Sequence, residues 1–376
     1  MPKNPSPTRP DLVVVGAGIV GLAHAVEAIK RGLSVLVIER DERAVGASVR
    51  NFGHGCVTGQ LGENQAWALA ARDRWHELAR DAGFWIGTGG AVIAARSADE
   101  LAVVQELVGS GHGDARLLDR RQVAEHVDLS DDVLGGAHLP LDIRVNPREA
   151  VGAIAAWVSG QRSGAIWWST SMLGLDGDVV RTSRGDVTAG RTVVCVGHNV
   201  DRVFPDIAAT AGVQRCALHM LRVASPGTRT IAPAVLSGTS LLRYPAFKAM
   251  PAAAALHERY ERDHADLLGA GLNLMFTQLP NGDLTVGDTH GYATTLGAYN
   301  DEALDDLVLD ETARLLGEDR LTVKQRWRGV YASAPRDTLV AAVSATATVV
   351  AVTSGVGMTI AHGLAGTVLD EMLATA

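Results

Sequence analysis

The sequence has few of the features that mark secreted, membrane or nucleic-acid-binding proteins. Its 376 residues include only three cysteines, Cys56, Cys195 and Cys216, which are too far apart for a disulfide framework or a zinc site. No stretch of 18 residues is apolar throughout and free of glycine and charge, so we expect no transmembrane span. The net charge of −8 argues against nucleic acid or an anionic membrane as the main partner. We also expect no metal.

The first ten residues lack the apolar region of a signal peptide. Residues 1–10, MPKNPSPTRP, are polar and rich in proline, and we expect a short disordered lead. A hydrophobic content of 47% supplies ample core for one large domain or two closely associated ones. Together these features predict a cytoplasmic globular protein. Whether it forms a homo-oligomer stays open.

A glycine-rich turn near the N-terminus is the most informative feature present. The apolar run Leu12–Val15 has the length of a buried parallel strand, and residues 19–30 have helical periodicity. Gly16, Gly18 and Gly21 lie between and within them at G-x-G-x-x-G spacing. A second strand at 34–38 ends at Glu39, 23 residues after Gly16.

Each part of this motif suits a dinucleotide. Gly16 permits the tight turn, Gly18 allows a pyrophosphate to approach the backbone, and Gly21 allows helix and strand to pack closely. The helix N-terminus offers N–H donors to phosphate, and Glu39 can accept hydrogen bonds from an adenosine ribose. The motif predicts an ADP-containing cofactor and leaves NAD and FAD open.

A second glycine-containing turn near the C-terminus favours FAD. Strand 348–353 runs into Gly355 and Gly357, and a helix follows from about Met358 to Leu373. A helix N-terminus at this point directs N–H groups at an electron-rich ligand. A flavin gains negative charge on reduction and is stabilised by such a helix, whereas a nicotinamide cofactor has no need of one. A nicotinamide-dependent dehydrogenase is therefore the weaker alternative.

The remaining pattern predicts an α/β protein whose dinucleotide fold is interrupted by an insertion. Helices are expected at 65–82, from 97, at 119–126, from 146, at 252–268 and at 301–316. Strands are expected at 91–95, 135–139, 165–171, 179–182, 186–189, 191–199, 214–223, 321–333 and 339–343, with a hairpin turn at Pro280–Asp283. We assign residues 11–80, 145–212 and 335–376 to a Rossmann-like FAD-binding domain. Residues 81–144 and 213–334 then form an inserted antiparallel-sheet substrate domain.

These motifs resemble the D-amino-acid-oxidase-like FAD-dependent oxidoreductases, the group that includes glycine and sarcosine oxidases. GAGIVG with Glu39, TVVCVGHN at 192–199 and SGVGMTIAHGLAG at 354–366 carry the resemblance, which covers almost the whole chain. It implies non-covalent FAD held by residues from all three segments. They are Gly16, Gly18, Ile19, Val20, Gly21, Glu39, Arg40, Ser48, Arg50, Asn51, Phe52, Met172, Val196, Gly197, Gly355, Gly357, Met358 and Thr359.

Three further stretches look like a branch of this family associated with phosphonate metabolism. They are GASVRNFGH at 46–54, GDTH at 287–290 and QRWRGVYAS at 325–333. The resemblance implies an aminophosphonate substrate, such as 2-aminoethylphosphonate or its N-methyl derivative. Tyr331 stands where amino-acid oxidases of the family carry an arginine that clamps the substrate carboxylate. We therefore expect another anion site, built from Arg50, Arg243, Tyr244, His290, Arg328 and Tyr331.

The resemblance implies an oxidase with little side-chain chemistry. A neutral amine loses hydride to flavin N5, the imine hydrolyses to an aldehyde, and dioxygen reoxidises the flavin to give hydrogen peroxide. We expect no obligatory general base; Arg50, His54, His290 and Tyr331 are the candidate catalytic residues. Arg50, His54 or Lys324 could assist reaction with oxygen. A covalent flavin link to His54 or Cys56 is an alternative that acid precipitation would test.

Two other functions stay open at this point. One is a glycine, sarcosine or D-amino-acid oxidase or dehydrogenase, against which Tyr331 argues. The other is a non-catalytic or tRNA-modifying flavoprotein, against which the acidic charge balance argues.

Overall fold

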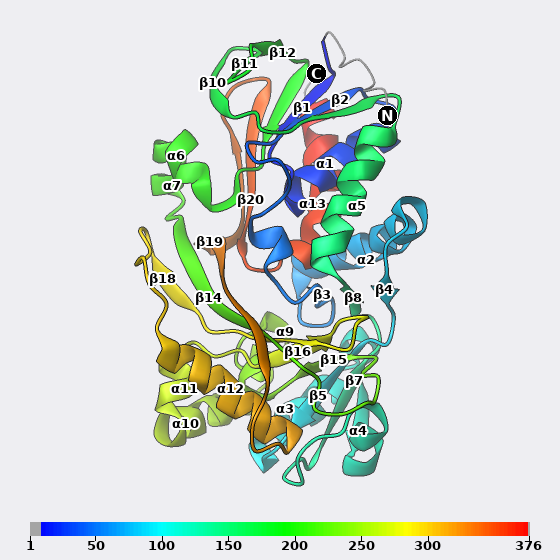
Figure 1. Ribbon diagram of the computed structural model, residues 1–376, viewed down its shortest axis with the longest axis vertical. Helices are drawn as coiled ribbons and strands as arrows, with labels where there is room; N and C mark the ends of the chain where they lie inside the picture. The colour runs from blue at the N-terminus through cyan, green and yellow to red at the C-terminus, as the bar shows by residue number, and fades with distance from the viewer. Residues whose placement is uncertain (1–8, 375–376) are drawn as a thin grey trace.

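The computed structural model describes residues 9–374 as two halves stacked along the long axis of the molecule (Figure 1). The first and last elements described, β1 (Leu12–Val15) and α13 (Gly357–Ala374), both lie in the upper half of that view. Of the expected disordered lead, residues 1–8 lie outside the described residues. Pro10 is ordered, since its carbonyl accepts a 2.9 Å hydrogen bond from the Gly190 N–H. Among the described residues, backbone hydrogen bonds to the rest of the fold thus begin at Pro10, one residue before Asp11, where the FAD-binding domain was expected to start.

The upper half is built on a layer of five parallel strands. Its order is β20 (Ala347–Ser354), β13 (Arg191–Val194), β1 (Leu12–Val15), β2 (Val35–Ile38) and β9 (Gly164–Trp167). Helices α1 (Ile19–Lys30), α2 (Gly62–Ala82), α5 (Pro147–Gly160) and α13 (Gly357–Ala374) pack together over one face. A small sheet is formed by β10 (Met172–Asp176), β11 (Val179–Thr182) and β12 (Val187–Thr188). It packs against the other face of the five-stranded layer, at the top of Figure 1. Because β1 and β2 are buried on both faces, they read as continuous apolar runs.

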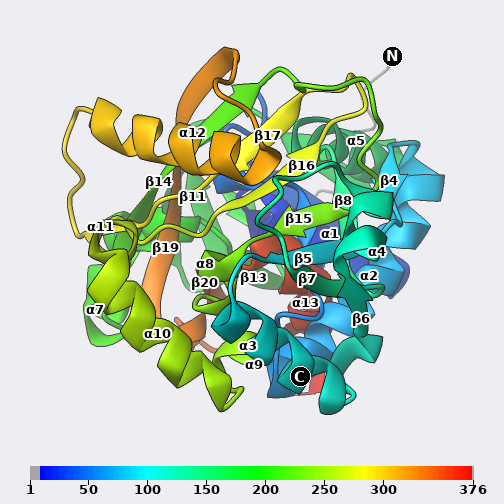
Figure 2. The ribbon, with the colours of Figure 1, turned by 90° about the horizontal axis from the view of Figure 1, so that it is seen from below.

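The lower half is a mixed sheet with helices around it. Its strands run in the order β6 (Arg116–Asp119), β7 (Gly135–Leu139), β5 (Ala91–Ala95), β15 (Ala234–Leu236), β16 (Met275–Gln278), β17 (Leu284–Gly287) and β14 (Gln214–Val223). Helix α12 (Glu302–Leu316) packs on β14 and β17. Helices α3 (Ala98–Gly109) and α10 (Ala252–Asp263) pack against each other, and α3 also contacts β5 and β7 (Figure 2). The predicted hairpin is confirmed: β16 and β17 are antiparallel, and Leu279 N–H donates to the Asp283 carbonyl across the turn.

One long strand, β19 (Val323–Ala342), joins the two halves. Its first part pairs with β14 and its second part with β20, so the strands of both halves form one 14-stranded sheet. Two separate strands at 321–333 and 339–343 were expected, and this was wrong. The Pro335-Arg336-Asp337 interruption does not end the strand; it produces only an irregularity in the pairing between Ser333 and Thr338. The expected domain boundary after residue 334 falls inside β19.

Shorter elements complete the region between the halves. Strands β3 (His54–Gly55), β8 (Ile143–Val145) and β4 (Ile86–Gly87) form a three-stranded sheet, and β18 (Gly291–Ala293) pairs with β14. Short helices are η1 (Ala47–Val49), η2 (His112–Asp114), η3 (Gly197–Asn199), α4 (Arg120–His126), α6 (Val200–Val203), α7 (Pro205–Thr210), α8 (Gly238–Leu241), α9 (Pro245–Lys248) and α11 (Ala265–Gly269). Within residues 9–374, no helix combines the length and apolar character needed to cross a membrane.

Candidate active site

A cavity of about 510 Å³ extends from the carboxyl ends of the parallel strands toward the lower half. Val15 and Ile38, the last residues of β1 and β2, line it together with Tyr244 and Met275 from the lower half. Its volume is within the range of ordinary ligand sites, and its position is the usual ligand site of open parallel sheets.

The N-terminal glycine turn forms one wall of this cavity. Gly16 has φ +105°, and a Cβ there would lie 2.4 Å from the Cys195 carbonyl oxygen. Gly21 faces away from the cavity, where a Cβ would lie 1.9 Å from the Gly16 carbonyl oxygen. Gly21 thus has the packing function expected of it, but it is the one predicted cofactor residue that does not line the cavity.

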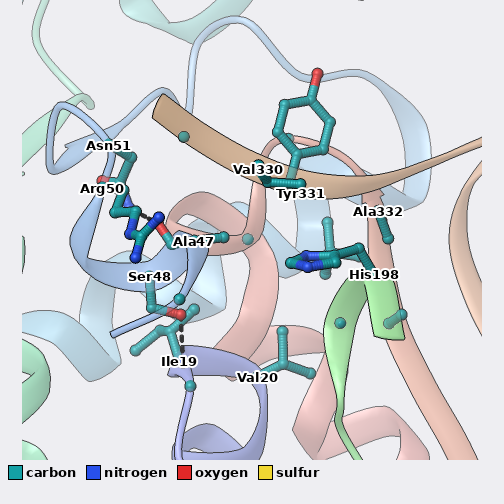
Figure 3. A pocket seen from close by; sticks show the side chains of 18 of the residues that line it. Ile19, Val20, Ala47, Ser48, Arg50, Asn51, His198, Val330, Tyr331 and Ala332 are labelled. Carbon is teal, nitrogen blue, oxygen red and sulfur yellow. Dashed lines mark hydrogen bonds between the residues drawn. The ribbon is translucent and has the colours of Figure 1, made fainter. Parts of the chain in front are cut away.

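Two side chains hold the start of α1 in place. The Glu39 carboxylate accepts a 2.8 Å hydrogen bond from Ala17 N–H, which places this acid beside the glycine turn. The Ser48 hydroxyl accepts a 2.8 Å hydrogen bond from Ile19 N–H, shown in Figure 3. The loop between β2 and α2 is therefore attached to the helix N-terminus, as a loop around a bound dinucleotide would be.

The C-terminal turn lines the same cavity beside the start of α1, since a Cβ at Gly357 would lie 3.7 Å from the Ile19 side chain. Gly355 has φ +80°, and a Cβ there would lie 3.0 Å from the Tyr331 ring. The Thr359 hydroxyl accepts a hydrogen bond from Cys56 N–H at 3.1 Å, and Trp75 donates to the Met358 carbonyl at 2.8 Å. Helix α13 starts at Gly357, and its first N–H groups have no acceptor within the helix. Both glycine turns therefore face one cavity.

The residues present fit the predicted FAD. Two helix N-termini and an acid beside the first turn surround a cavity to which the backbone is exposed at glycines. All the predicted cofactor residues except Gly21 line this cavity, including Met172, Val196 and Gly197 from the middle of the chain. Arg40, Arg50, Asn51 and Phe52 line it from the loop after β2.

At the other end of the cavity, two tyrosines hold an arginine. Arg243 Nη2 donates to the Tyr331 hydroxyl at 2.8 Å, and Nη1 donates to the Tyr292 hydroxyl at 3.0 Å. In Figure 3 the Tyr331 hydroxyl points away from Ile19 and Ser48. Tyr244 also lines the cavity and donates to the Met275 sulfur at 3.6 Å. Arg243, Tyr244 and Tyr331, three of the six residues expected at the anion site, thus lie together.

An acid and a histidine lie at the same end. Asp288 is 5% exposed and accepts a 3.1 Å hydrogen bond from the Asn273 amide. Burial raises the pKa of Asp288 to about 7, against the opposing effect of the Arg243 charge. His290 Nδ1 contacts the Gly271 carbonyl at 2.8 Å, and burial lowers the pKa of His290 to about 3. The histidine is therefore neutral, and Nδ1 carries its proton because a carbonyl can only accept.

Two predicted basic residues lie outside the cavity. Arg328 was expected to bind substrate, and this was wrong: its guanidinium donates to Asn300 Oδ1 and the Gly297 carbonyl, each at 2.6 Å. Arg328 is three residues from Tyr331 on β19, and an odd separation puts the two side chains on opposite faces of a strand. Lys324 is paired with Asp283, away from the lining residues.

His54 and Cys56 line the cavity in a buried loop. His54 Nε2 contacts Asp142 Oδ2 at 2.9 Å, and the other Asp142 oxygen accepts from Thr58 N–H at 2.8 Å. Burial raises the pKa of the Cys56 thiol well above its ordinary value. The side chains of His54, Cys56 and Asp142 have potential metal-ligand atoms within 4.8 Å of one another, but both Asp142 oxygens already have hydrogen-bond partners. The cluster anchors the loop.

The sequence-based assignment missed four residues of this site. Asp288 belongs to the GDTH stretch, yet only His290 was assigned from it. Asn273 belongs to the site because it donates a hydrogen bond to Asp288, and Tyr292 belongs to it because it accepts one from Arg243. Sequence spacing does not reveal such pairs. His198 lines the cavity, and burial together with nearby arginines lowers its pKa to about 4.

Comparisons with known proteins agree with this geometry. Residues 11–371 match the family model described as DAO, FAD dependent oxidoreductase. One of the subunits of opine oxidase from Rhizobium meliloti is 25% identical over 252 residues, which are 61% of this chain and 66% of that protein. The chain thus covers just under two thirds of this relative's length.

Solved structures share the fold over nearly the whole chain. Glycine oxidase from Geobacillus kaustophilus has a TM-score of 0.76 at 17% identity, covering 97% of this chain and 95% of that one. Iminodiacetate oxidase from Chelativorans sp. BNC1 has a TM-score of 0.72 at 17% identity, covering 96% and 95%. With two glycine turns facing one cavity and a family match over residues 11–371, the chain belongs to the DAO family of FAD-dependent oxidoreductases.

Proposed function

We propose that this protein is an oxidase of a small primary or secondary amine that carries an anionic group. The favoured substrate is 2-aminoethylphosphonate or its N-methyl derivative. The observation that carries the proposal is the Arg243 guanidinium, which lines the cavity with two tyrosine hydroxyls as its hydrogen-bond partners.

Arg243 keeps its positive charge available to a ligand. Its two partners are neutral hydroxyls, and no described carboxylate lies within salt-bridge distance of it. Each tyrosine oxygen also has a hydroxyl hydrogen to donate while it accepts from Arg243. Arg243 and Tyr331, which both line the cavity, can therefore donate hydrogen bonds to the oxygens of a tetrahedral anion, and those from Arg243 are charge-assisted.

Tyr331 argues against an ordinary amino acid as substrate. Its position on β19 is the one at which the family resemblance expects a carboxylate-binding arginine. With the cation at Arg243 instead, the anion would bind at a different place relative to the flavin end of the cavity. A substrate with a longer arm between amine and anion, such as an aminoethylphosphonate, accommodates that change.

The work of the protein residues is to bind and orient. FAD, when bound, accepts the two electrons of amine oxidation and passes them on to an acceptor, for which we propose dioxygen. Arg243 and Tyr331 would fix the anion, Tyr292 would hold Arg243, and the buried residues around Asp288 would enclose the amine and exclude water. No described side chain is required to accept a carbon-bound proton in this scheme.

An anaerobic substrate screen tests the proposal. Purified protein that contains flavin should be bleached by 2-aminoethylphosphonate or its N-methyl form without oxygen and should release peroxide with oxygen. A flavin that neither compound reduces would exclude both substrates. Bleaching without peroxide in air would identify a dehydrogenase.

A second candidate is an oxidase or dehydrogenase of glycine, sarcosine, a D-amino acid or an iminodiacetate-like compound. It is favoured by the names of the structural neighbours and by the ability of Arg243 to bind a carboxylate as well as a phosphonate. The same screen with these compounds decides between the two candidates.

A further inference from the structure

We propose that Asp288 and His290 together form the ammonium-binding site for the substrate's amine, at the same end of the cavity as the proposed anion site at Arg243. This inference rests on the proposed function in one respect, that the substrate is an amine. It adds a recognition element that the sequence did not reveal: a pair of hydrogen-bond acceptors facing each other in the cavity.

The two acceptors are defined by their other hydrogen bonds. Asp288 Oδ1 is occupied by the Asn273 amide, whereas Oδ2 has no hydrogen-bond donor among residues 9–374. His290 donates through Nδ1 to the Gly271 carbonyl, which leaves Nε2 as a lone-pair acceptor. His290 Nε2 lies 3.8 Å from Asp288 Oδ2, beyond hydrogen-bond distance.

Two buried acceptors at this separation call for a donor between or beside them. Asp288 is 5% exposed and His290 9% exposed, so bulk water does not satisfy them freely. A donor about 2.8–3.0 Å from each atom is compatible with their 3.8 Å separation. An ammonium group is a donor without acceptor capacity, and its charge complements the carboxylate.

The surrounding residues hold this pair rigidly. Asn273 and Asp288 exchange backbone hydrogen bonds of 2.8 and 3.0 Å, in addition to the side-chain contact. His290 N–H donates to the Ala270 carbonyl at 3.0 Å. Asp288 and His290 share the cavity end with Arg243, which affects the pKa of each. The site thus offers one charge of each sign to a small zwitterion.

The test compares one amine substrate with its deaminated analogue. For 2-aminoethylphosphonate the analogue is ethylphosphonate, measured as a competitive inhibitor. In the Asp288→Asn variant we expect KM for the amine to rise on the order of tenfold to hundredfold. The inhibition constant of ethylphosphonate should stay the same or fall, because a negative charge has been removed near the anion. An equal rise in both constants, or no change in either, would overturn the proposal.

A matched control and a pH series complete the experiment. Asp263→Asn changes an exposed carboxylate of the same half and should leave both constants unchanged. In the wild type, KM for the amine should rise as the pH falls from 8 to 6 more steeply than in Asp288→Asn, since protonation removes the carboxylate charge. Arg243, Tyr244, Cys216, His290 and Tyr331 face the same region, but their pKa values lie outside this window. Identical pH profiles in the two proteins would contradict the proposal.

The outcome is separable from that of the proposed function. If the wild type oxidises glycine instead of the aminophosphonate, the same comparison is made with glycine and acetate. In that case the phosphonate assignment fails while the ammonium site is still tested. If no amine reduces the flavin at all, both proposals fail together.

Discussion

At the scale of single residues, Arg243 is the proposed anchor for the anionic group of the substrate. Its partners are two tyrosine hydroxyls, so replacing it with Gln keeps hydrogen-bonding capacity and removes the charge. We expect Arg243→Gln to raise KM for the amine about tenfold to hundredfold, consistent with the loss of a charge-assisted hydrogen bond of roughly 1.5–3 kcal/mol. Steady-state kinetics with peroxide detection measure this effect.

Arg328→Gln is the matched control for that experiment. Arg328 lies on the same strand as Tyr331 but is bound to the loop at Gly297 and Asn300. Its replacement should change KM less than twofold or threefold. If the two variants had equal effects, Arg243 would not be the anion anchor.

A second residue-scale prediction concerns how FAD is attached. The Cys56 thiol is buried with a raised pKa, so it is a poor nucleophile, and His54 is bonded to Asp142. Acid precipitation should therefore release all yellow colour into the supernatant. A yellow pellet that becomes colourless in Cys56→Ser or His54→Gln would contradict the non-covalent assignment.

The sequence predicted site residues well where a motif fixes the backbone. Gly16, Glu39 and Gly355 line the cavity because their positions follow from strand-turn-helix geometry. Arg328 was assigned wrongly since its side-chain direction depends on strand register. Asp288 was missed because its significance comes from burial and from the position of His290, and one sequence does not disclose either.

At the scale of elements, the turn before α13 is closely packed against β19. Gly355 has φ +80°, and a Cβ would lie 3.0 Å from the Tyr331 ring. Gly355→Ala should cost about 1–2 kcal/mol from backbone conformation alone and displace Tyr331. We expect weaker FAD retention and a raised KM, measured by flavin content after gel filtration and by kinetics.

Gly366→Ala is the control for Gly355→Ala. It lies inside α13, and a Cβ would have its nearest contact at 3.9 Å, with the flexible Arg31 side chain. Alanine favours a helix over glycine, so this variant should be neutral or slightly more stable. Equal loss of flavin in both variants would show that the turn has no special role.

Two buried histidines on α1 and α13 make the packing of these helices sensitive to acid. His24 is fully buried with no partner for Nε2, and neither ring nitrogen of His362 has a partner among the described residues. Burial lowers the pKa of His24 from 6.5 to about 4 and that of His362 from 6.5 to about 3. Both rings are neutral in the folded protein at pH 7.

Stability should therefore fall as the pH is lowered. Because the pKa of each histidine is lowered in the folded state, the unfolded chain binds protons at a higher pH than the folded protein does. The contribution of these two histidines to the free energy of unfolding is therefore complete above pH 6.5 and is lost as the pH falls toward 4 for His24 and toward 3 for His362. Between pH 7 and 5, each histidine should reduce the free energy of unfolding by about 2 kcal/mol.

Denaturant unfolding at several pH values measures this loss. In His362→Leu the decrease between pH 7 and 5 should be smaller than in the wild type. The exposed His257→Leu should keep the full decrease. An unchanged pH dependence in His362→Leu would contradict the assignment.

Sequence patterns predicted most elements correctly, and β19 shows where they fail. The hairpin at 275–287 and helix α12 follow from turn residues and caps that act locally. The continuity of β19 depends on its partners β14 and β20, which lie far away in sequence. Pro335 is compatible with a strand there because the ladder is already irregular between Ser333 and Thr338.

At the scale of the whole molecule, one sheet runs through both halves. β19 is hydrogen-bonded to β14 and to β20, so neither half can unfold without removing the partner of a strand in the other. We expect a single unfolding transition, with fluorescence from tryptophans of the upper half and circular dichroism giving the same midpoint. Two separated transitions would show that the halves are independent domains.

The sequence predicted the general organisation of the chain, with a split Rossmann-like region and an insertion. Glycine motifs at both ends of the chain made this visible, because they meet at one cavity. The boundaries remain predictions. A domain boundary near residue 335 is hard to define from composition, because residues on both sides of it belong to the same strand, β19.

The unbroken strand also limits how this enzyme can be recombined with its relatives. Substrate-binding regions are often exchanged between homologous enzymes as separate modules, joined at a loop. Here the segment that presents Tyr331 continues into the strand that pairs with β20, so any exchange of the substrate half must cut or copy β19. New specificities are therefore more accessible through Arg243, Asp288 and Tyr292, which lie outside that strand, than through transfer of the whole half.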